Sequence, residues 1–355
     1  MKYNIALLPG DGIGPEVTAQ AKKALDAIAD IYNHTFIYTK ALVGAVAIDE
    51  TGNPLPEETI DICEASDAIL FGAIGHPKYD NDPSAKVRPE QGLLRLRKSL
   101  GLFCNIRPVK AYERLIDNSP LKREIISGTD ISIYRELTGG IYFGDKHLSD
   151  DGQVASDGCS YSVEEISRIA HLAFKEAQKR RKKLTLVDKA NVLETSRLWR
   201  KTVTEISKEY ADVELDFLFV DNAAMQMILN PSQFDVIIGG SIGLLASASV
   251  GLENALFEPI HGSFPQGAGK DIANPLASIL SAAMLLRHLN LNEEAEIVEK
   301  AVEKSLELGI TTKDINPEKA FPTSKVGDFI ADYITHPEDT NVNFRNVHMG
   351  QSTII

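Results

Sequence analysis

The sequence predicts an α/β fold in which helices cover a largely parallel sheet. Three observations lead to this prediction: short apolar runs with the length of buried strands, apolar positions at helical spacing between them, and turns rich in Gly and Pro at the joins. Strands that alternate with helices along a chain usually pair in parallel within one sheet. A length of 355 residues is enough for two domains, or for one large chain folded in two lobes.

The first elements are the clearest. A strand is expected over Tyr3–Leu8, followed by the turn Gly10–Gly14. A helix then begins with a proline at its first position, Pro15, and an acid, Glu16, against the positive end of the helix dipole. Further strands are expected at Ala68–Phe71, Ile131–Tyr134, Leu184–Val187, Leu215–Val220 and Val236–Ile238, and further helices at Gly92–Leu100, from a Ser162–Glu165 capping box onward, around Trp199–Tyr210, and at Leu276–Leu289.

Composition excludes several classes of protein. Hydrophobic residues make up 43% of the chain and charged residues 25%, which excludes a disordered or fibrous protein. A net charge of −13 argues against nucleic-acid binding, and no apolar run approaches the ~20 residues of a membrane span. Three scattered cysteines are too few for a disulfide framework or a zinc site. With no leader expected before the first strand, these features predict a cytoplasmic protein.

Polar side chains collect where the predicted strands end. Arg135 and Glu136 follow one strand, Asp188 and Lys189 follow the next, and Asp221 follows a third. Ligands of open α/β sheets bind beyond the carboxyl ends of the strands, so several such ends together predict a cleft. The glycine turn after the first strand has the spacing G-x-G-x-G, which differs from the dinucleotide fingerprint. It is therefore equally compatible with a structural turn and with a ligand loop.

Basic residues are crowded into a few segments of this acidic chain. Arg97, Arg107 and Arg135 could together hold a di- or tricarboxylate, because a guanidinium binds a carboxylate through two parallel hydrogen bonds. Arg95 and Lys98 are expected to lie on a solvated helix face. The run 179–183 is expected to complement the negative end of the preceding helix and to be solvated. The Gly- and Pro-rich stretch 261–275 is typical of a ligand loop.

Five motifs together resemble the decarboxylating β-hydroxyacid dehydrogenases, the family of isocitrate and isopropylmalate dehydrogenases, from about Tyr3 to Ile330. They are Leu8–Glu16, Arg135–Gly144, Val187–Leu193, Val220–Gln226 and Glu258–Ser263. The resemblance implies a two-domain fold with a large mixed sheet, distinct from the Rossmann fold. A discontinuous cofactor-side domain would comprise 1–102 and 240–335, and a second domain with the dimer contact would comprise 103–239. The tail 336–355, which has few apolar residues, is expected to be poorly ordered.

The same resemblance implies the site residues of a homodimer with shared active sites. Arg97, Arg107 and Arg135 would hold the malate carboxylates of the substrate. Tyr142 would act from one subunit, and Lys189 and Asp221 would come from its partner. Asn191 would lie near the nicotinamide of NAD, and the adenosine half of the cofactor would be held by His261, Gly262, Ser263, Gln266 and Asn274.

The resemblance also implies the substrate and the chemistry. Glu90, Leu93, Leu94 and Val192 would form a wall suited to an isopropyl group, where isocitrate-type relatives carry a serine and an asparagine. The substrate would then be 3-isopropylmalate, oxidised and decarboxylated with Lys189 as the base or relay and Tyr142 as the acid that protonates the enolate. Mg²⁺ or Mn²⁺ would polarise the oxygens of the substrate. No Lys or Arg lies between His261 and Gly269 to receive a 2′-phosphate, which favours NAD over NADP.

One departure from the family pattern affects the metal. After Phe234–Ile237 the family carries a segment with two metal-binding aspartates, and this chain lacks about sixteen residues there, some four helical turns' worth. No acid occurs between Asp235 and Glu253, which leaves Asp221 as the only matching metal ligand. Two hypotheses remain open: an active dehydrogenase with weakened metal binding, or a silent member that still binds a dicarboxylate or a dinucleotide.

Overall fold

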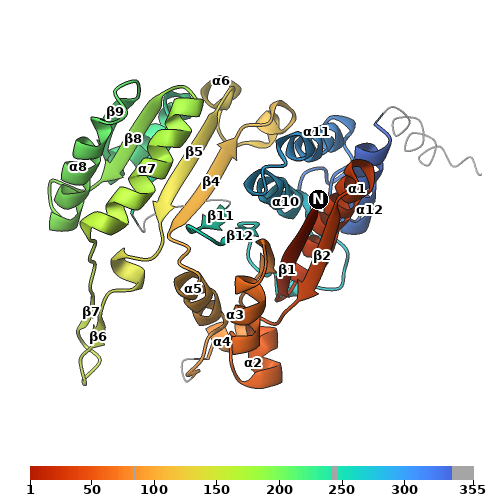
Figure 1. The fold of residues 1–355 in the computed structure, drawn as a ribbon, viewed down its shortest axis with the longest axis horizontal. Helices are drawn as coiled ribbons and strands as arrows, with labels where there is room; N and C mark the ends of the chain where they lie inside the picture. The colour runs from red at the N-terminus through yellow and green to blue at the C-terminus, as the bar shows by residue number, and fades with distance from the viewer. Residues whose placement is uncertain (83–84, 241–246, 338–355) are drawn as a thin grey trace, which may run out of the picture. The chain divides into compact units, whose positions relative to one another are not determined.

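The structure, a computed structural model, describes residues 1–82, 85–240 and 247–337. The described chain folds into two compact units (Figure 1). Both ends of the sequence build the first unit, Met1–Leu96 with the described part of Asn254–Ile355, and Arg97–Glu253 builds the second. Each unit combines helices with strands, most of them paired in parallel, so the predicted α/β fold with a large mixed sheet is confirmed.

The boundaries of the domains remain a prediction. The expected domains were 1–102 with 240–335, and 103–239. The tail predicted to be poorly ordered lies outside the described residues, apart from His336 and Pro337.

Four parallel strands form the sheet of the first unit, in the order β2-β1-β3-β12. They are β1 (Lys2–Gly10), β2 (Thr35–Lys40), β3 (Ala68–Ala73) and β12 (Ala255–Glu258). Every residue of the central strand β3 is buried. A parallel strand is covered on both faces, which explains why its sequence is apolar throughout and does not alternate.

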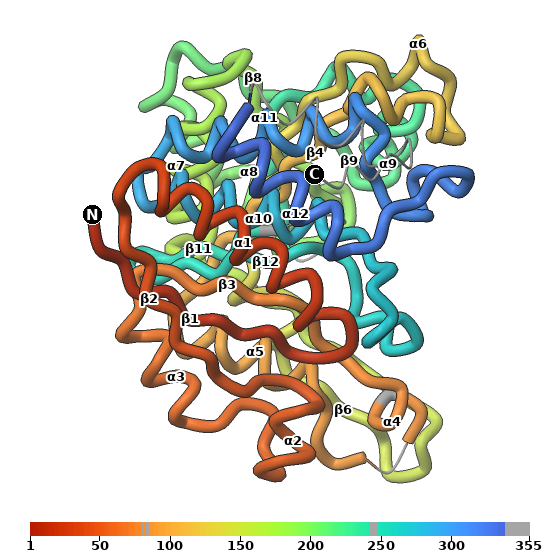
Figure 2. The backbone as a smooth tube through the Cα atoms, turned by 90° about the vertical axis from the view of Figure 1, so that its right-hand side faces the viewer, coloured from red at the N-terminus to blue at the C-terminus, as the bar shows by residue number. Residues whose placement is uncertain are grey.

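The helices of the first unit cover this sheet from both sides. They are α1 (Gly14–Tyr32), α2 (Ala45–Thr51), α3 (Glu57–Glu64), α4 (Pro77–Asp80), α5 (Pro89–Ser99, which continues past the end of the unit), α10 (Leu276–His288), α11 (Asn292–Leu308) and α12 (Thr323–Thr335). Helix α1 packs on α10 and α12, and both α1 and α10 contact β3. Figure 2 shows α1, α10 and α12 on one side of β1 and β3, with α2 and α3 on the other.

The turn after β1 holds a buried carboxylate. Asp11, 4% exposed, accepts hydrogen bonds from the backbone N–H groups of Ala45 (2.8 Å), Val46 (2.9 Å) and Gly75 (2.9 Å). Burial raises the pKa of Asp11 above its ordinary value, although the three N–H donors oppose the shift. Two of the donors begin α2. Asp11 therefore accepts from N–H groups that have no acceptor within that helix, and it faces the positive end of the helix dipole.

The glycines of this turn are required by close backbone approach. Gly10 and Gly12 have positive φ angles of 66° and 59°. A Cβ on Gly12 would lie 1.9 Å from the carbonyl oxygen of Ser263, and a Cβ on Gly10 would lie 2.0 Å from that of Ala73. Tight packing therefore accounts for the glycine spacing, and the structural alternative for this turn is supported.

We expect Asp11→Ala to lower the free energy of unfolding by about 2–4 kcal/mol, because three backbone N–H groups lose their acceptor at once. Urea denaturation followed by circular dichroism measures the change. Asp49→Ala is the matched control, because Asp49 also lies on α2 but has an exposed carboxylate. That carboxylate accepts hydrogen bonds from two side chains, Lys78 and Tyr79. Equal losses for the two variants would contradict a special role of Asp11.

The sheet of the second unit has six strands in the order β11-β4-β5-β10-β8-β9. They are β4 (Cys104–Lys110), β5 (Asp130–Glu136), β8 (Lys183–Asp188), β9 (Glu214–Phe219), β10 (Val236–Gly239) and β11 (Ser247–Val250). Strand β4 is antiparallel to β5 and β11, and the other pairs are parallel. A separate hairpin pairs β6 (Lys146–Leu148) with β7 (Ala155–Asp157).

Helices of the second unit pack on its sheet. The α-helices are α6 (Arg123–Ile126), α7 (Val163–Lys179), α8 (Glu194–Ser207) and α9 (Val220–Leu229), and the short 3₁₀ turns include η2 (Gly140–Tyr142). The predicted capping box of α7 is confirmed, with Ser162 and Glu165 bonded to each other's backbone N–H groups. Helix α8 ends at Ser207, earlier than predicted. Tyr210 nevertheless reaches the core, where its ring stacks on Phe174 at 4.8 Å between centroids.

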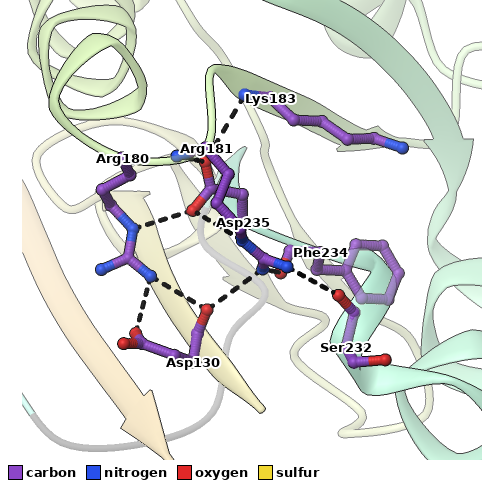
Figure 3. A network of polar contacts seen from close by, with 7 residues as sticks. All are labelled: Asp130, Arg180, Arg181, Lys183, Ser232, Phe234 and Asp235. Carbon is purple, nitrogen blue, oxygen red and sulfur yellow. Dashed lines mark hydrogen bonds and ion pairs between the residues drawn. The ribbon is translucent and has the colours of Figure 1, made fainter. Parts of the chain in front are cut away.

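The basic run 179–183 is exposed at Lys179, Arg181 and Lys182, as expected, but it is also bonded into the fold, and Arg180 and Lys183 are half-buried. Arg180 Nε donates to Asp235 Oδ1 (2.9 Å), and Arg180 Nη2 donates to Asp130 Oδ1 (2.6 Å). The backbone N–H of Arg181 donates to Asp235 Oδ2 (2.7 Å), and its guanidinium bonds the carbonyl oxygens of Ser232 and Phe234 (Figure 3). The run therefore joins the end of α7 to the starts of β5 and β10.

Candidate active site

Side chains of opposite charge meet at one edge of the second unit's sheet. Strands β5, β10, β8 and β9 are parallel neighbours, so their carboxyl ends lie at the same edge. Arg135 and Glu136 end β5, Lys189 follows β8, and Asp221 lies in the first turn of α9, directly after β9. Three of the four strand ends from which a cleft was predicted therefore lie along one edge, and the cleft itself stays a prediction. The glycine turn after β1 belongs to the first unit.

Two of the three candidate arginines lie on adjacent antiparallel strands. Asn105 of β4 faces Arg135 of β5, and Arg107 lies two residues further along the same face of β4. Arg107 Nε donates to Asn105 Oδ1 at 2.5 Å. Asn105 is fully buried (0% exposed), and its amide nitrogen donates to Ser249 Oγ of β11 at 3.3 Å. The buried Asn105 thus orients the guanidinium of Arg107.

Arg135 is connected to the candidate acid. Its guanidinium lies over the ring of Tyr142, 5.1 Å from the ring centroid, and Arg135 is only 8% exposed. Tyr142 ends η2 and is 45% exposed, so its hydroxyl-bearing ring borders both an arginine and solvent. This contact places the predicted carboxylate-binding group, Arg135, beside the predicted acid, Tyr142.

Lys189 and Asp221 form an ion pair. Lys189 Nζ donates to Asp221 Oδ1 at 3.0 Å, and the ammonium lies 5.8 Å from the centroid of the Phe219 ring. The pKa of Asp221 lies below its ordinary value, mainly because of the hydrogen bond from Lys189. Asp221 thus stays ionised to lower pH than a free aspartate. Any stability gained from this pair is fully present at pH values above the pKa of Asp221 in the unfolded chain. It is lost as the pH falls through the lower pKa of Asp221 in the folded chain.

The backbone that carries Lys189 is held by its neighbours. The buried carboxylate of Asp188 accepts two hydrogen bonds from the guanidinium of Arg200, at 2.8 and 3.0 Å, and a third from the N–H of Ala190. The N–H of Lys189 donates to Ser196 Oγ of α8 at 3.1 Å. Two further predicted site residues, Asn191 and Val192, follow in the same turn, and both are exposed.

The candidates on α5 have different environments. Leu93 is nearly buried (9% exposed), Leu94 is half-buried and Glu90 is exposed. Leu93 therefore belongs chiefly to the apolar core, whereas Glu90, Leu94 and Arg97 follow one another at helical spacing along another side of the helix. Of the predicted isopropyl wall on α5, Leu94 is the more accessible apolar side chain.

The predicted adenosine loop lies in the first unit and is fixed by structural bonds. Ser263 accepts the N–H of Ile13 through its carbonyl oxygen (2.8 Å). Asn274 Oδ1 accepts the N–H of Leu276 at the start of α10 (3.0 Å), and Asn274 Nδ2 donates to Asp314 (2.9 Å). Gly262 and Gln266 are exposed.

His261 carries the feature of this loop that fits a dinucleotide. Its Nδ1 bonds the carbonyl oxygen of Gly262 at 3.0 Å, which makes Nδ1 the donor and leaves Nε2 as an acceptor in the neutral ring. His261 Nε2 is buried without a hydrogen-bond partner among the described residues. A buried acceptor without a partner costs free energy, and an N–H of a nucleotide base would satisfy it.

A divalent metal fits the described residues poorly. Within residues 1–82, 85–240 and 247–337, no group of three His, Cys, Asp or Glu side chains could hold a metal ion. Asp221, the predicted ligand, is bonded to Lys189. The position where the family carries its two aspartates leads into residues 241–246, which lie outside the described residues.

Asn105 and Arg200 are supporting residues that the sequence did not reveal. Both act on predicted site residues from a neighbouring position in space, Asn105 on Arg107 and Arg200 on the strand end before Lys189. An asparagine in a strand, two residues before an arginine, is a signal that could have identified Asn105, since positions i and i+2 share a face. No comparable signal points to Arg200, twelve residues from Asp188.

The profile of the isocitrate/isopropylmalate dehydrogenase family matches residues 4–330. The chain belongs to this family. The 3-isopropylmalate dehydrogenase of Bacteroides fragilis is 49% identical over 352 residues, covering 94% of this chain and 99% of that protein. The enzyme of the same name from Aquifex aeolicus is 49% identical over 360 residues, covering 95% and 99%. The crystal structure of isocitrate dehydrogenase from Methylococcus capsulatus matches with a TM-score of 0.84 and 31% identity, covering 94% of this chain and 100% of that chain.

Membership in this family supports a decarboxylating dehydrogenase that acts on a small dicarboxylate and uses a dinucleotide and a divalent metal in general. The alignment with the Bacteroides fragilis protein is 352 residues long, but it includes only 94% of the 355 residues of this chain. That relative therefore has residues with no counterpart in this chain. In the part of the chain that the structure describes, no helix is long and apolar enough to cross a membrane.

Proposed function

We propose that this family member oxidatively decarboxylates 3-isopropylmalate with NAD, yielding 4-methyl-2-oxopentanoate for leucine biosynthesis. The observation that supports it most is the position of Arg135, Lys189 and Asp221 along one sheet edge, with Tyr142 against Arg135 and Arg107 on the strand beside it. The chain that carries them is about 50% identical to proteins named 3-isopropylmalate dehydrogenase. Arginines suit the two carboxylates of a malate, and the lysine and tyrosine suit its two proton transfers.

The chain's own residues account for binding and proton transfer. Arg97, Arg107 and Arg135 hold the two carboxylates and so orient the hydroxyl-bearing carbon. Lys189 takes the hydroxyl proton as that carbon loses a hydride, and NAD supplies the hydride acceptor. The C–C bond to the neighbouring carboxylate then breaks, carbon dioxide leaves, and Tyr142 gives a proton to the carbon of the resulting enolate. Asp221 accepts a hydrogen bond from Lys189 Nζ and so holds this side chain at the edge. Lys189 acts as the base in its neutral amine form, and it becomes the ammonium when it has taken the hydroxyl proton.

Substrate choice within the family rests on apolar contacts. Leu94 offers a half-buried apolar surface on α5, about one helical turn before Arg97. Burying an isopropyl group against Leu94, Leu93 and Val192 is worth ~1.5–3 kcal/mol. A third carboxylate at the same wall would be desolvated without a partner, which costs more. Glu90 on this helix adds a negative charge that disfavours isocitrate further.

For the cofactor we favour NAD over NADP. The loop 261–274 has an accessible glutamine, Gln266, that can hydrogen-bond a ribose hydroxyl, and it has a buried acceptor, His261 Nε2, for the base. Its first basic residue is Lys270, beyond Gly269. A 2′-phosphate would therefore find no cation in the first part of the loop, where the adenosine half is expected.

We also propose a homodimer in which Lys189 and Asp221 complete the active site of the other subunit. Helix α9 carries Asp221 in its first turn and exposes Met225 (50%), Ile228 (56%) and Leu229 (57%) in its later turns. A second copy would cover this apolar face, since exposed apolar patches commonly mark protein interfaces. Sedimentation velocity would show a dimer, and a monomer at micromolar concentration would contradict the proposal.

A reducing cytoplasm is the proposed location. All three thiols are free: Cys63 and Cys104 are buried, and Cys159 is exposed. Burial raises the pKa of Cys63 to about 12 and raises that of Cys104 as well, so both thiols stay protonated and unreactive at neutral pH.

The function is tested by spectrophotometric NAD reduction with magnesium or manganese present. The substrates are 3-isopropylmalate and isocitrate, and the cofactors are NAD and NADP. We expect kcat/KM to be higher for 3-isopropylmalate with NAD than for any other pair. Equal or better use of isocitrate would show that the leucines of α5 do not select the substrate.

A second candidate function is a silent family member that binds a dicarboxylate or a dinucleotide without turnover. Two observations favour it: the missing acids between Asp235 and Glu253, and the poor fit of the described residues to a metal. One carboxylate with the hydroxyl and carboxyl oxygens of the substrate would bind magnesium weakly. Isothermal calorimetry separates the candidates, because a silent member would bind 3-isopropylmalate or NAD while the optical assay shows no NADH.

Restoring the missing segment should strengthen metal binding. A variant that receives the family's segment with its two aspartates after Ile237 regains two carboxylates. Its magnesium affinity in the presence of 3-isopropylmalate should rise at least about tenfold, the loss that removing even an outer-shell partner of a metal causes. A second variant with the same segment and both aspartates changed to asparagine controls for length. Tight, stoichiometric metal binding by the unaltered chain would mean that other acids, such as Asp188 or Glu194, replace the lost pair.

Replacing Arg107 should weaken substrate binding and spare the fold. Arg107→Ala leaves a substrate carboxylate unpaired, and we expect a loss of about 2–5 kcal/mol in 3-isopropylmalate binding, measured by calorimetry. Arg95→Ala is the control, because Arg95 pairs with Glu57 on the surface of the first unit. An unchanged dissociation constant for Arg107→Ala would remove this arginine from the site.

A further inference from the structure

One buried carboxylate fixes the backbone that leads to Tyr142. Strand β5 ends at Glu136, which is 0% exposed. Its oxygens accept hydrogen bonds from the N–H of Thr138 (3.0 Å), the hydroxyl of Thr138 (2.7 Å) and the N–H of Gly139 (2.7 Å). These donors lie in the loop between β5 and η2, and Tyr142 is the last residue of η2. The carboxylate therefore determines the direction in which the chain leaves the sheet.

A cation anchors this carboxylate from α7. Arg168 Nη2 donates to Glu136 Oε1 at 3.1 Å and also bonds the hydroxyl of Thr138. The guanidinium lies over the ring of Phe103, 4.6 Å from its centroid, and the carbonyl oxygen of Phe103 accepts the N–H of Leu137 at 2.8 Å. The first residues of the loop are thus joined to α7 and to the residue before β4.

The loop is also confined on its other side. A Cβ on Gly139 would lie 2.9 Å from the ring of Tyr161, so the loop backbone passes directly against that ring. The Tyr161 ring packs edge-on against the buried Trp199, at 5.4 Å and 85°. The N–H of Gly140 donates to the carbonyl oxygen of Ser160 at 2.8 Å. Packing and hydrogen bonds thus hold this segment from both sides.

We propose that Glu136, Thr138 and Arg168 are positioning residues that set the Tyr142 hydroxyl for proton transfer. This inference rests on the proposed function, in which Tyr142 protonates the enolate. Tyr142 is 45% exposed, and its approach to Arg135 depends on the loop that Glu136 holds. Arg135 itself is placed by the pairing of β5 with β4. Loosening the loop therefore displaces the tyrosine and leaves the arginine in place.

The mildest test removes one hydroxyl. Thr138→Val keeps the branched shape and the backbone N–H bond but loses both hydroxyl contacts, to Glu136 and to Arg168. Thr129→Val is the matched control: Thr129 is buried (5% exposed) just before β5, at the opposite end of that strand, and its hydroxyl has no hydrogen-bond partner among the described residues. Glu136→Gln is the stronger variant, because an amide cannot accept all of these bonds.

Hydrogen exchange followed by mass spectrometry measures how strongly the backbone amides of the loop are protected, and it needs no assay of activity. We expect peptides spanning 137–144 to exchange about tenfold faster in Thr138→Val and faster still in Glu136→Gln, while peptides from α8 and β9 are unchanged. Thr129→Val should exchange like the wild-type chain throughout 137–144. Unchanged exchange in both loop variants would overturn the inference, whether or not the wild-type chain turns over.

Kinetics with Tyr142→Phe then tests what the loop does. In the wild-type background, Thr138→Val should lower kcat on the order of tenfold to a hundredfold, the range for a small misplacement of a reacting group, with little change in the dissociation constant of 3-isopropylmalate. In the Tyr142→Phe background the same substitution should have almost no further effect. If the two losses multiply, Thr138 acts through overall stability and the positioning role is wrong. A wild-type chain without turnover would refute the proposed function alone, and the exchange result would still decide the position of the loop.

Discussion

Replacing Lys189 with methionine should lower kcat for 3-isopropylmalate by about 10²–10⁴-fold, the usual contribution of a positioned acid or base. Lys189 is the one lysine that the fold places at the shared strand edge with an ionised partner, Asp221, at 3.0 Å within the described residues. Methionine keeps the length and the apolar stem but cannot take a proton. Steady-state NAD reduction gives kcat, and calorimetry gives substrate affinity separately.

Two companion variants make this result specific. Lys189→Arg keeps the positive charge but has no accessible neutral form, so it should restore binding and leave turnover low. Lys208→Met removes a surface lysine of a similar ion pair, with Glu205 at 2.6 Å, and should leave turnover unchanged. If Lys189→Arg restores turnover, the charge of Lys189 matters and its proton transfer does not.

Replacing Asp235 with alanine should lower the free energy of unfolding by about 3–5 kcal/mol, the cost of breaking a buried ion pair from one side. Asp235 is 1% exposed and accepts hydrogen bonds from Arg180 Nε, the N–H of Arg181 and the N–H of Lys183 (Figure 3). These donors lie between the end of α7 and the first residue of β8, so the loss of the bonds loosens the join of both elements to β10. Urea denaturation measures the change.

Asp212→Ala is the control for that experiment. Asp212 also pairs with the basic run, accepting from Lys182 at 3.1 Å, but both side chains are exposed. Surface pairs of this kind contribute little, so the denaturation midpoint should remain almost where it was. Equal destabilisation by the two substitutions would mean that the burial of Asp235 does not set its importance.

Local sequence signals predicted a part of the fold, because each signal depends on neighbours along the chain. Apolar runs located β3, β5, β8, β9 and β10, and a serine followed by a glutamate located the start of α7. Such signals fail where a residue acts across the fold. Arg180 and Arg181 look like surface charges in sequence, yet Asp130 and Asp235, some fifty residues away in the chain, bind them.

The site was predictable to the same extent and for the same reason. Strand ends located Arg135, Lys189 and Asp221, since a parallel sheet brings its carboxyl ends together. The roles of Asn105, Arg168 and Arg200 depend on pairing between strands and on packing of α7 and α8, which no local pattern encodes. The exposure of a helical side chain also depends on packing: of the two leucines that the resemblance places in a substrate wall, Leu93 is 9% exposed and Leu94 is half-buried.

The most direct test of the central claim follows both products of one reaction. The chain is incubated with 3-isopropylmalate, NAD and magnesium, and NADH is measured by absorbance while 4-methyl-2-oxopentanoate is measured by chromatography. The proposed function predicts equal amounts of the two, formed at a rate that falls in the Lys189→Met variant. The contradicting result is that the chain binds 3-isopropylmalate but forms neither product, and that both products form only when the missing segment is added after Ile237. This chain would then be a silent member of the family.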